Sequence, residues 1–212
     1  MVRVSVLMPV YRTNEEYLRE AISSILAQTY SDFEFLILDD CPEDDRELIV
    51  KSYKDRRIKY LRNETNMGIS ESRNKLVDMA RGEYLAVMDH DDVSLPERLE
   101  KQVDYLDAHP DVGVVGCWTD VFPDNKGLYF PSDDFKIKSL MMNICAVVHP
   151  SSMLRKSVLI ENKIRYEKEY SPAEDYKLWC SLMEFTRFYN ISEVLFSIVH
   201  MITGLLFYKK RQ

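Results

Sequence analysis

The sequence predicts an α/β fold in which a mostly parallel central sheet carries helices on both faces. Short apolar runs alternate with segments of helical periodicity over residues 1–117. This alternation is typical of parallel strands joined by crossover helices. Acidic residues follow two of the predicted strands. Because parallel sheets bind ligands at the carboxyl ends of their strands, we expect a site at that edge.

The first strand is expected at residues 3–10, a short apolar run with Pro9 near its end. Such a run is typical of a strand that is buried on both faces. Thr13 and Glu16 have the spacing of a capping box, which predicts the start of a helix. The apolar residues behind them recur with the period of one helix face, at Leu18, Ala21, Ile22, Ile25 and Leu26.

Further strands are expected where short apolar runs recur, at residues 33–38, 58–61, 84–88 and 112–117. A helix containing Leu48 and Ile49 joins the first two of these strands. A helix over residues 69–80 joins the next two. Proline is favoured in the first turn of a helix, so Pro96 predicts the start of the helix before the last strand.

The pattern is looser in the second half of the chain. Residues 120–134 are rich in Asp, Pro and Gly, which predicts a loop with a short strand around Tyr129. Helices are expected over residues 133–142 and 175–184. A short strand is expected between them at residues 153–154.

Composition excludes several classes of protein. Hydrophobic residues make up 46% of the chain and charged residues 30%, which is a globular balance. The net charge of −7 argues against a broad nucleic-acid-binding face. The four cysteines contain no C-x-x-C pair, and no secretory signal precedes the first strand, so a cytoplasmic location is expected. The glycine fingerprints of dinucleotide-binding folds and P-loops are absent.

Three aspartates lie within residues 89–92, at the end of a predicted strand. Their charges repel, so the cluster needs either solvent or a divalent cation. Carboxylate oxygens suit Mg²⁺ or Mn²⁺, which also bind diphosphate oxygens. The alternative is a solvated turn in which Asp92 or Ser94 caps the next helix, and the residues alone leave both interpretations open. A calcium loop is excluded because Ser94 replaces the required glycine and Pro96 interrupts the loop.

Five sequence blocks, in this order, resemble glycosyltransferase family 2. They cover about residues 3–199 and read VSVLMPVYRTNEEYLREAISSILAQTYSDFEFLILDD, NMGISESRN, GEYLAVMDHDDVSLPERLEKQVDYLDAHPDVGVVG, HPSSMLRKS and AEDYKLW. The resemblance implies a GT-A fold, a single Rossmann-like domain over residues 1–199, and an inverting mechanism with a divalent metal. It also implies a nucleotide-sugar-binding half over residues 1–117 and an acceptor-binding half over 118–199.

The resemblance implies a nucleotide site on the loops after the first two strands. Pro9, Val10 and Tyr11 match the first loop, with Tyr11 packing on the base. Asp40 matches the acid that hydrogen-bonds the base, usually uracil, since a carboxylate accepts a hydrogen bond from an imide N–H. Asp39 is expected to orient the loop. The alternatives are a surface aromatic at Tyr11 and a plain turn at the two aspartates.

Four further positions are carried over from the family to the donor site. Arg73 matches a residue near the nucleotide or diphosphate, where a guanidinium suits phosphate oxygens. Asn66 and Gly68 are expected to shape the backbone before it. His149 matches a position near the donor phosphates or the mouth of the acceptor site. The alternatives are an exposed ion pair at Arg73 and a buried structural histidine at His149.

The resemblance assigns the chemistry to carboxylates. Asp89, Asp91 and Asp92 match the metal motif, with Asp91 facing the sugar or ribose, Asp92 binding the metal and Asp89 taking either role. Asp175, which follows Glu174, matches the catalytic base that takes the proton of the acceptor hydroxyl. The alternative for Asp175 is a helix N-cap with Glu174 in the first turn.

The end of the chain departs from the family pattern. Residues 194–208 are largely apolar, and Lys209, Lys210 and Arg211 follow them. A spanning helix needs about 20 apolar residues, so this stretch is short for one. It is either an interfacial segment with a basic tail near anionic lipids, or, as we favour, a last core strand and a short helix. Residues 200–212 are expected to form the tail.

The sequence therefore predicts an inverting, metal-dependent glycosyltransferase with Mn²⁺ or Mg²⁺ as cofactor. The expected donor is a nucleotide-sugar, most simply a UDP-sugar. The expected acceptor is a saccharide or lipid-linked saccharide in surface polysaccharide synthesis. Peripheral association with the inner face of the cell membrane and the oligomeric state stay open. One alternative is an inactive nucleotide-sugar-binding protein of the same fold. Another is a nucleotidyltransferase, which the absence of glycine from residues 9–16 argues against.

Overall fold

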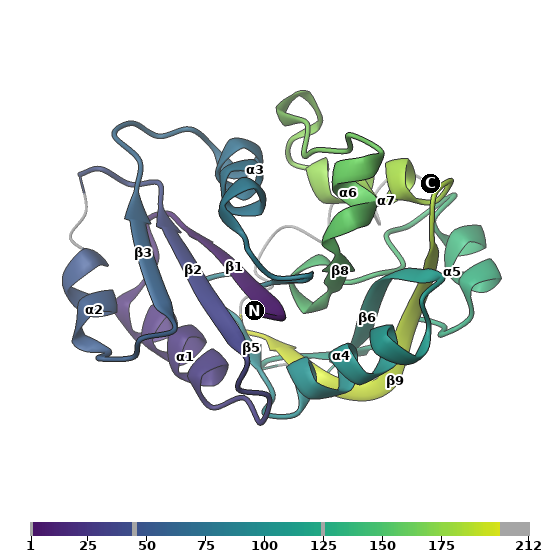
Figure 1. The fold of residues 1–212 in the computed structure, drawn as a ribbon, viewed down its shortest axis with the longest axis horizontal. Helices are drawn as coiled ribbons and strands as arrows, with labels where there is room; N and C mark the ends of the chain where they lie inside the picture. The colour runs from purple at the N-terminus through teal and green to yellow at the C-terminus, as the bar shows by residue number, and fades with distance from the viewer. Residues whose placement is uncertain (1, 44–45, 124–125, 200–212) are drawn as a thin grey trace.

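A computed structural model describes residues 2–43, 46–123 and 126–199 (Figure 1). The strands are β1 (Val4–Val10), β2 (Phe33–Asp39), β3 (Ile58–Arg62), β4 (Tyr84–Val87), β5 (Val93–Ser94), β6 (Val112–Val121), β7 (Lys126–Leu128), β8 (Met153–Arg155) and β9 (Arg187–Ile198). The α-helices are α1 (Glu15–Leu26), α2 (Arg46–Ser52), α3 (Ile69–Met79), α4 (Arg98–Ala108), α5 (Asp134–Leu140), α6 (Lys156–Glu161) and α7 (Glu174–Leu182). Two 3₁₀-helices are η1 (His149–Ser151) and η2 (Lys168–Tyr170). In these ranges no helix has the length and apolar character to cross a membrane.

The strands form one sheet in the order β3-β2-β1-β4-β8-β6-β9-β5, and β7 pairs with β6. Strands β3, β2, β1 and β4 form one block of mutually parallel strands, and β6 and β9 form a second parallel pair. Strand β8 is antiparallel to both β4 and β6. The predicted α/β class is confirmed, and β8 joins the two parallel blocks into a single sheet.

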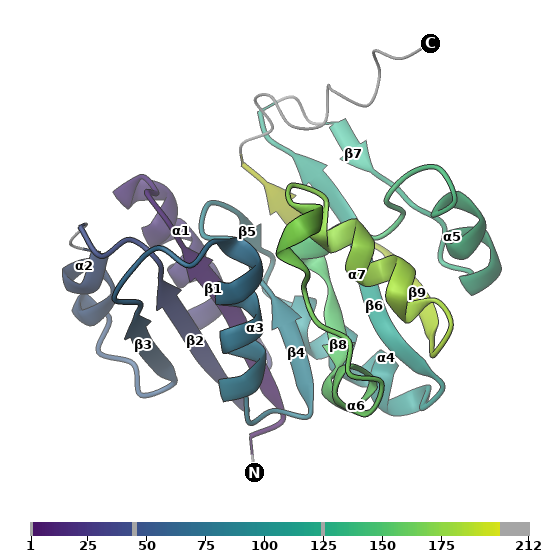
Figure 2. The ribbon, with the colours of Figure 1, turned by 90° about the horizontal axis from the view of Figure 1, so that it is seen from above.

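Helices cover both faces of the sheet, as predicted. One apolar cluster packs α1, α2 and α4 against one face, and a second packs α3, α5, α6 and α7 against the other. Figure 1 shows α1 and α4 below the sheet, and α3, α6 and α7 above it. Figure 2 shows α3, α6 and α7 side by side on the near face. Trp179 of α7 is fully buried in the second cluster.

The structure corrects the predicted start of the first helix. Asn14 is the N-cap of α1, and its side chain accepts a hydrogen bond from the backbone N–H of Glu16 at 2.8 Å. The Thr13 hydroxyl instead donates to the carbonyl of Asn14 at 3.3 Å. Asparagine caps helices at least as well as threonine, so the capping-box assignment was one residue early.

The apolar stretch near the end of the chain begins as the favoured interpretation expects. Residues up to Ile198 belong to β9, which pairs in parallel with β6 along its length. The proposed short helix and basic tail, residues 200–212, lie outside the described residues. The strand expected around Tyr129 is β7, which ends at Leu128.

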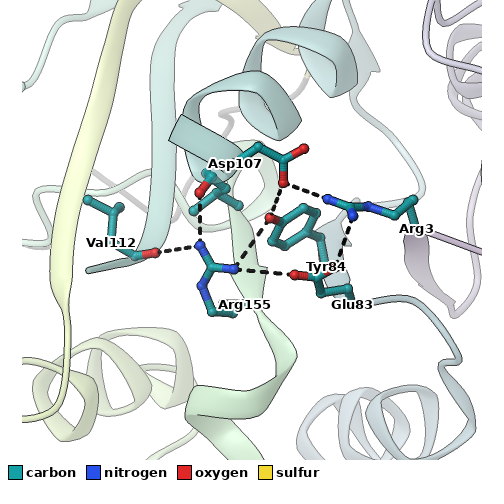
Figure 3. A network of polar contacts seen from close by, with 7 residues as sticks. Arg3, Glu83, Tyr84, Asp107, Val112 and Arg155 are labelled. Atoms are coloured by element: carbon teal, nitrogen blue, oxygen red, sulfur yellow. Dashed lines mark hydrogen bonds and ion pairs between the residues drawn. The ribbon is translucent and has the colours of Figure 1, made fainter. Parts of the chain in front are cut away.

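A polar network holds the sheet at the amino ends of β1 and β4 (Figure 3). Asp107 of α4 accepts hydrogen bonds from Arg3 and from the Tyr84 hydroxyl. Arg155 of β8 pairs with Glu83 at 3.4 Å and donates to the Leu106 carbonyl at 2.9 Å. These contacts join β1, β4, β8 and α4 at the edge away from the acidic motifs, which follow the opposite ends of β2 and β4.

Candidate active site

A cavity of about 210 Å³ opens at the carboxyl ends of β1 and β2. Its lining comprises Pro9, Val10, Tyr11, Asp40, Asn66, Gly68, Ile69, Ser72 and His90. Six of these residues are ones that the family pattern assigns to the nucleotide. The fold thus brings together three segments that lie far apart in the sequence, at the edge where the strand pattern predicts a ligand. Tyr11 is 41% exposed, so its ring is available to a planar ligand.

Asp40 shapes one wall of this cavity. Its carboxylate accepts hydrogen bonds from the backbone N–H groups of Met67 and Gly68, each at 2.8 Å, and from the Asn63 amide at 2.7 Å. Gly68 has a φ of +82°, in the left-handed region that favours glycine, and it precedes the first turn of α3. The second oxygen of Asp40 accepts one of these bonds and keeps a lone pair for another donor.

Asp39 plays a different part from its neighbour. It is fully buried and does not line the cavity. One of its oxygens accepts from the backbone N–H of Cys41 at 2.9 Å, and the other accepts from the Tyr60 hydroxyl at 2.7 Å. Burial, together with this bond to Asp39, raises the pKa of Tyr60. Asp39 therefore holds the turn after β2, which agrees with its expected role.

The acidic motif lies in the turn between β4 and β5. Asp89 and Asp91 are partly exposed, whereas Asp92 is only 4% exposed. Within the part of the chain that the structure describes, Asp92 accepts one long hydrogen bond, from the backbone N–H of Val199 at 3.3 Å. Burial, and then the negative charges of Asp89 and Asp91, raise the pKa of Asp92 well above its ordinary value. A buried carboxylate with so few donors is a good ligand for a cation.

The arrangement of the acidic side chains tests whether a divalent metal fits between β4 and β5. Among the described residues, no three His, Cys, Asp or Glu side chains converge on one point. Mg²⁺ and Mn²⁺ sites at nucleotides need only one or two protein carboxylates, because substrate phosphates and water complete the coordination. The under-coordinated carboxylate of Asp92, with Asp89 and Asp91 beside it, fits such a partial site.

Arg73 of α3 joins the acidic motif to the start of α7. Its guanidinium is 3.0 Å from Asp89 and 3.2 Å from Glu174, and it lies over the ring of Tyr166 at 5.6 Å. Arg73 is 7% exposed and does not line the cavity. Its role beside the diphosphate stays a prediction, whereas its contact with two acidic residues is observed.

Asp175 lies in the first turn of α7, beside Glu174. The N-cap of this helix is Ala173, so the alternative interpretation of Asp175 as the cap is wrong. Asp175 is half-buried and accepts a hydrogen bond from the backbone N–H of Tyr176 at 2.6 Å. Burial raises the pKa of Asp175, against the opposing effects of that bond and of the Arg73 charge. A carboxylate with a raised pKa is a better proton acceptor, as a general base requires.

His149 lies deeper than the family pattern suggests. It is 3% exposed, and its Nε2 atom is 2.9 Å from the Tyr166 hydroxyl. Its ring also packs against Trp179, with the ring centroids 5.4 Å apart. Burial, and then the charge of Arg73, lower the pKa of His149 well below its ordinary value, so the ring is neutral. This environment favours the buried structural alternative.

Two residues at the site had no assigned role in the sequence. His90, which the pattern treats as a spacer, lines the cavity beside Tyr11 and Asp40. Tyr166 links Arg73 to His149, and its backbone exchanges two hydrogen bonds with the Asn74 side chain, at 2.9 and 3.0 Å. His90 lies between Asp89 and Asp91 in the sequence, and this position could have predicted that it belongs to the site. Tyr166 carries no sequence signal, because its partners are far away along the chain.

Comparison with known proteins identifies the class. The structure resembles S. aureus TarS 1–349 in complex with UDP-GlcNAc, with a TM-score of 0.80 and 22% identity over 99% of this chain and 61% of TarS 1–349. It also resembles the mannosyltransferase PcManGT from Pyrobaculum calidifontis, in complex with GDP-Man and Mn²⁺, with a TM-score of 0.71 and 17% identity over 95% of this chain and 58% of the other. The fold is therefore that of the GT-A glycosyltransferases.

The sequence then gives the family. The chain belongs to glycosyl transferase family 2, whose sequence model matches residues 5–163. An uncharacterized glycosyltransferase of Methanocaldococcus jannaschii is 39% identical over 83% of this chain and 63% of its own length. The O-antigen biosynthesis glycosyltransferase WbnJ of Escherichia coli is 35% identical over 91% of this chain and 77% of its own length. The chain thus spans less than two thirds of the M. jannaschii relative.

Proposed function

We propose that the chain is an inverting hexosyltransferase that uses a nucleotide-sugar, most simply a UDP-sugar, as its donor. The observation that carries the proposal is the bridge made by Arg73, which contacts the acidic motif at Asp89 and the base motif at Glu174. Through this bridge, the residues proposed for the metal and the base belong to one site. The nucleotide cavity lies beside it and includes His90 of the acidic turn.

In this proposal residues 1–117 bind the donor and residues 118–199 bind the acceptor. Tyr11 packs on the base, and Asp40 accepts a hydrogen bond from the base N–H through its remaining lone pair. Pro9, Val10, Asn66 and Gly68 complete the cavity. A base with an imide N–H, as in uracil, suits an ionised carboxylate. The complexes of the structural neighbours with UDP-GlcNAc and GDP-Man support a nucleotide-sugar donor.

The proposed reaction is a single displacement at C1 of the donor sugar. The acceptor hydroxyl oxygen forms a bond to C1, on the face opposite the nucleoside diphosphate. The C1–O bond to the diphosphate breaks, and the diphosphate leaves with the electron pair. Asp175 takes the hydroxyl proton, which its half-buried position and raised pKa favour. Inversion at C1 follows from attack on the opposite face.

The proposed ligands of Mn²⁺ or Mg²⁺ are Asp89, Asp91 and Asp92. In this proposal Asp91 also faces the sugar or ribose. When bound, the cation neutralises charge on the leaving diphosphate. The Mn²⁺ in the complex of PcManGT supports a metal in this fold. The buried, poorly partnered carboxylate of Asp92 supports its location in this chain.

The proposed acceptor is a saccharide or lipid-linked saccharide of surface polysaccharide synthesis, and the proposed location is the cytoplasm at the inner face of the cell membrane. Similarity to WbnJ, which is named for O-antigen biosynthesis, supports this acceptor class. A catalytically inactive binding protein is the alternative. The presence of both Asp92 and Asp175 favours the enzyme.

The test is donor turnover by the purified chain, with UDP- and GDP-sugars, with and without Mn²⁺. We expect release of the nucleoside diphosphate that depends on Mn²⁺ and falls at least 100-fold in Asp175→Asn, with UDP binding kept. UDP binding without turnover, on any donor and with saccharide acceptors present, would favour the inactive alternative. A folded chain that binds no nucleotide with metal present would contradict both.

A further inference from the structure

Arg73 connects three separate parts of the chain. It lies on α3, Asp89 follows β4, and Glu174 begins α7. The guanidinium uses one terminal nitrogen for Asp89, at 3.0 Å, and the other for Glu174, at 3.2 Å. Both Arg73 and Glu174 are 7% exposed. A charge-assisted contact of this kind, with both partners buried, fixes the geometry of its partners more firmly than a surface ion pair does.

The first turn of α7 is held without a side-chain cap. Its N-cap residue, Ala173, makes no side-chain cap hydrogen bond. The second carboxylate oxygen of Glu174 is buried, with no hydrogen-bond partner in the part of the chain that the structure describes. The contact with Arg73 is thus the polar contact that fixes the Glu174 side chain, while the Tyr176 hydroxyl donates to the Met141 carbonyl on the same turn. Because Asp175 is the next residue, the contact with Arg73 also sets the place of Asp175.

We propose that Arg73 and Glu174 are positioning residues that couple the acidic motif at Asp89 to the general base Asp175. The inference rests on the proposed function, and it separates the roles of the two adjacent acids. Glu174 pairs with Arg73 and does not take the proton. Asp175 is only half-buried and can meet an acceptor, whereas the side chain of Glu174 is turned onto Arg73.

The charges around Asp175 give this proposal a readout that a purely structural contact lacks. The groups that act on it are Arg73 from α3, Glu174 from α7 and Asp89 after β4. The charge of Asp175 in turn raises the pKa of Cys145 and of Tyr166, which lie close to it. Arg73 is the cation of this set. Loss of its charge therefore moves the ionisation of Asp175 to higher pH.

The experiment compares Arg73→Gln, Glu174→Gln and the double variant, with each variant shown to be folded. We expect Glu174→Gln to lower kcat about 10-fold or more, with the donor KM within about twofold, and to keep the pH dependence of a single base. We expect Arg73→Gln to lower kcat likewise and to move the acid limb of its pH profile upward. The double variant should be little worse than Arg73→Gln alone, since the two side chains act as one unit.

A matched control is available in a second ion pair to α3, made by Arg165 from the segment between α6 and η2. Arg165 pairs with Asp78 of α3, close to the Arg73 contact in sequence, but the pair is exposed. Arg165→Gln should change kcat and the pH profile by less than about twofold, because an exposed ion pair contributes little. Equal effects of Arg165→Gln and Arg73→Gln would overturn the proposal.

A coupling measurement without substrate separates this proposal from the proposed function. The cycle of Arg73→Gln and Glu174→Gln should show an interaction of roughly 10-fold in the unfolding equilibrium constant. Turnover by the natural chain with no such interaction, or additive losses of kcat, would overturn the positioning role alone. Abolition of turnover by Glu174→Gln, with the acid limb lost, would make Glu174 the base and also overturn it. A chain with the interaction but no turnover on any donor would overturn both proposals.

Discussion

The carboxylate of Asp40, at the end of β2, accepts a hydrogen bond from the backbone N–H of Gly68 at 2.8 Å. This bond closes the loop before α3 onto the end of the second strand, and it thereby forms one wall of the nucleotide cavity. Gly68 has a left-handed φ of +82°. Asp40 thus holds this loop, and in the proposed function its second oxygen also accepts a hydrogen bond from the base.

We predict that Asp40→Ala weakens UDP binding by at least 10-fold. The change removes the proposed acceptor for the base and leaves the N–H groups of Met67 and Gly68 without their partner. Isothermal titration with UDP and Mn²⁺ measures the effect. Glu64→Ala, an exposed acid on the same loop, is the matched control and should leave the affinity unchanged. Full UDP affinity in Asp40→Ala would contradict the placement of the base in this cavity.

The rate should depend on pH through Asp175. A general base must be deprotonated, so kcat rises as pH rises through its pKa. Burial raises the pKa of Asp175, which moves this acid limb to higher pH than an ordinary aspartate would give. The measurement is kcat against pH at saturating donor, with the metal concentration held constant. Asp175→Asn should lack the limb. An acid limb at or below the ordinary aspartate pKa of about 3.9 would argue against this environment.

The strand pattern predicted the part of the site that depends on topology. Residues that follow parallel strands lie at one edge of the sheet. The sequence alone therefore predicts that Pro9, Asp40 and the turn after β4 lie together. The structure adds that Pro9 and Asp40 line the same cavity. The short strand predicted at residues 153–154 is β8, but its antiparallel direction and the two-residue strand β5 were not predicted, because strands this short carry almost no periodicity.

Side-chain partners could not be predicted in the same way. Arg73 contacts Glu174 across 101 positions of sequence, and nothing in either local pattern marks the pair. His149 illustrates the converse, since the family pattern places it near the donor but it is buried against Trp179 of α7 and against Tyr166. Long-range packing decides such contacts, whereas spacing and periodicity report only local structure.

Glu34 on β2 should control the acid stability of the fold. Its buried carboxylate accepts hydrogen bonds from Lys59 at 2.6 Å, Ser5 at 2.7 Å and the backbone N–H of Arg81 at 2.7 Å. Burial alone raises the pKa of Glu34, but these bonds outweigh it and lower the pKa to about 2. A depressed pKa contributes stability above the unfolded value of about 4.3, and this stability is lost as pH falls toward 2.

We therefore predict that Glu34→Gln destabilises the fold by about 3 kcal/mol at neutral pH, because it removes the ionised acceptor whose bonds to Lys59, Ser5 and Arg81 lower its pKa. The deficit should shrink between about pH 4.3 and pH 2, where the natural chain loses the same interaction. Urea unfolding at several pH values measures both effects. Glu47→Gln breaks the exposed pair with Lys51 and should cost less than about 0.5 kcal/mol. A deficit that did not change with pH would contradict the linkage.

Two glycines on either side of α3 should respond to alanine for different reasons. A Cβ at Gly82 would lie 2.5 Å from the backbone nitrogen of Ser5 and 2.7 Å from the carbonyl carbon of Val4. These are backbone atoms of β1, which pairs with β4, so they cannot shift without disturbing the sheet. A Cβ at Gly68 would meet nothing within 4 Å, but its φ of +82° is unfavourable for alanine.

We predict that Gly82→Ala destabilises the fold by about 3 kcal/mol and leaves UDP affinity unchanged in the molecules that fold, because the clash lies at the amino ends of β1 and β4. Gly68→Ala should cost about 2 kcal/mol, because a φ of +82° with a ψ of 164° is almost confined to glycine, and it should weaken UDP binding several-fold because it disturbs the cavity wall. Urea unfolding and UDP titration of both variants separate the two effects. The opposite ranking in either measurement would contradict the division between a structural edge of the sheet and a ligand-binding edge.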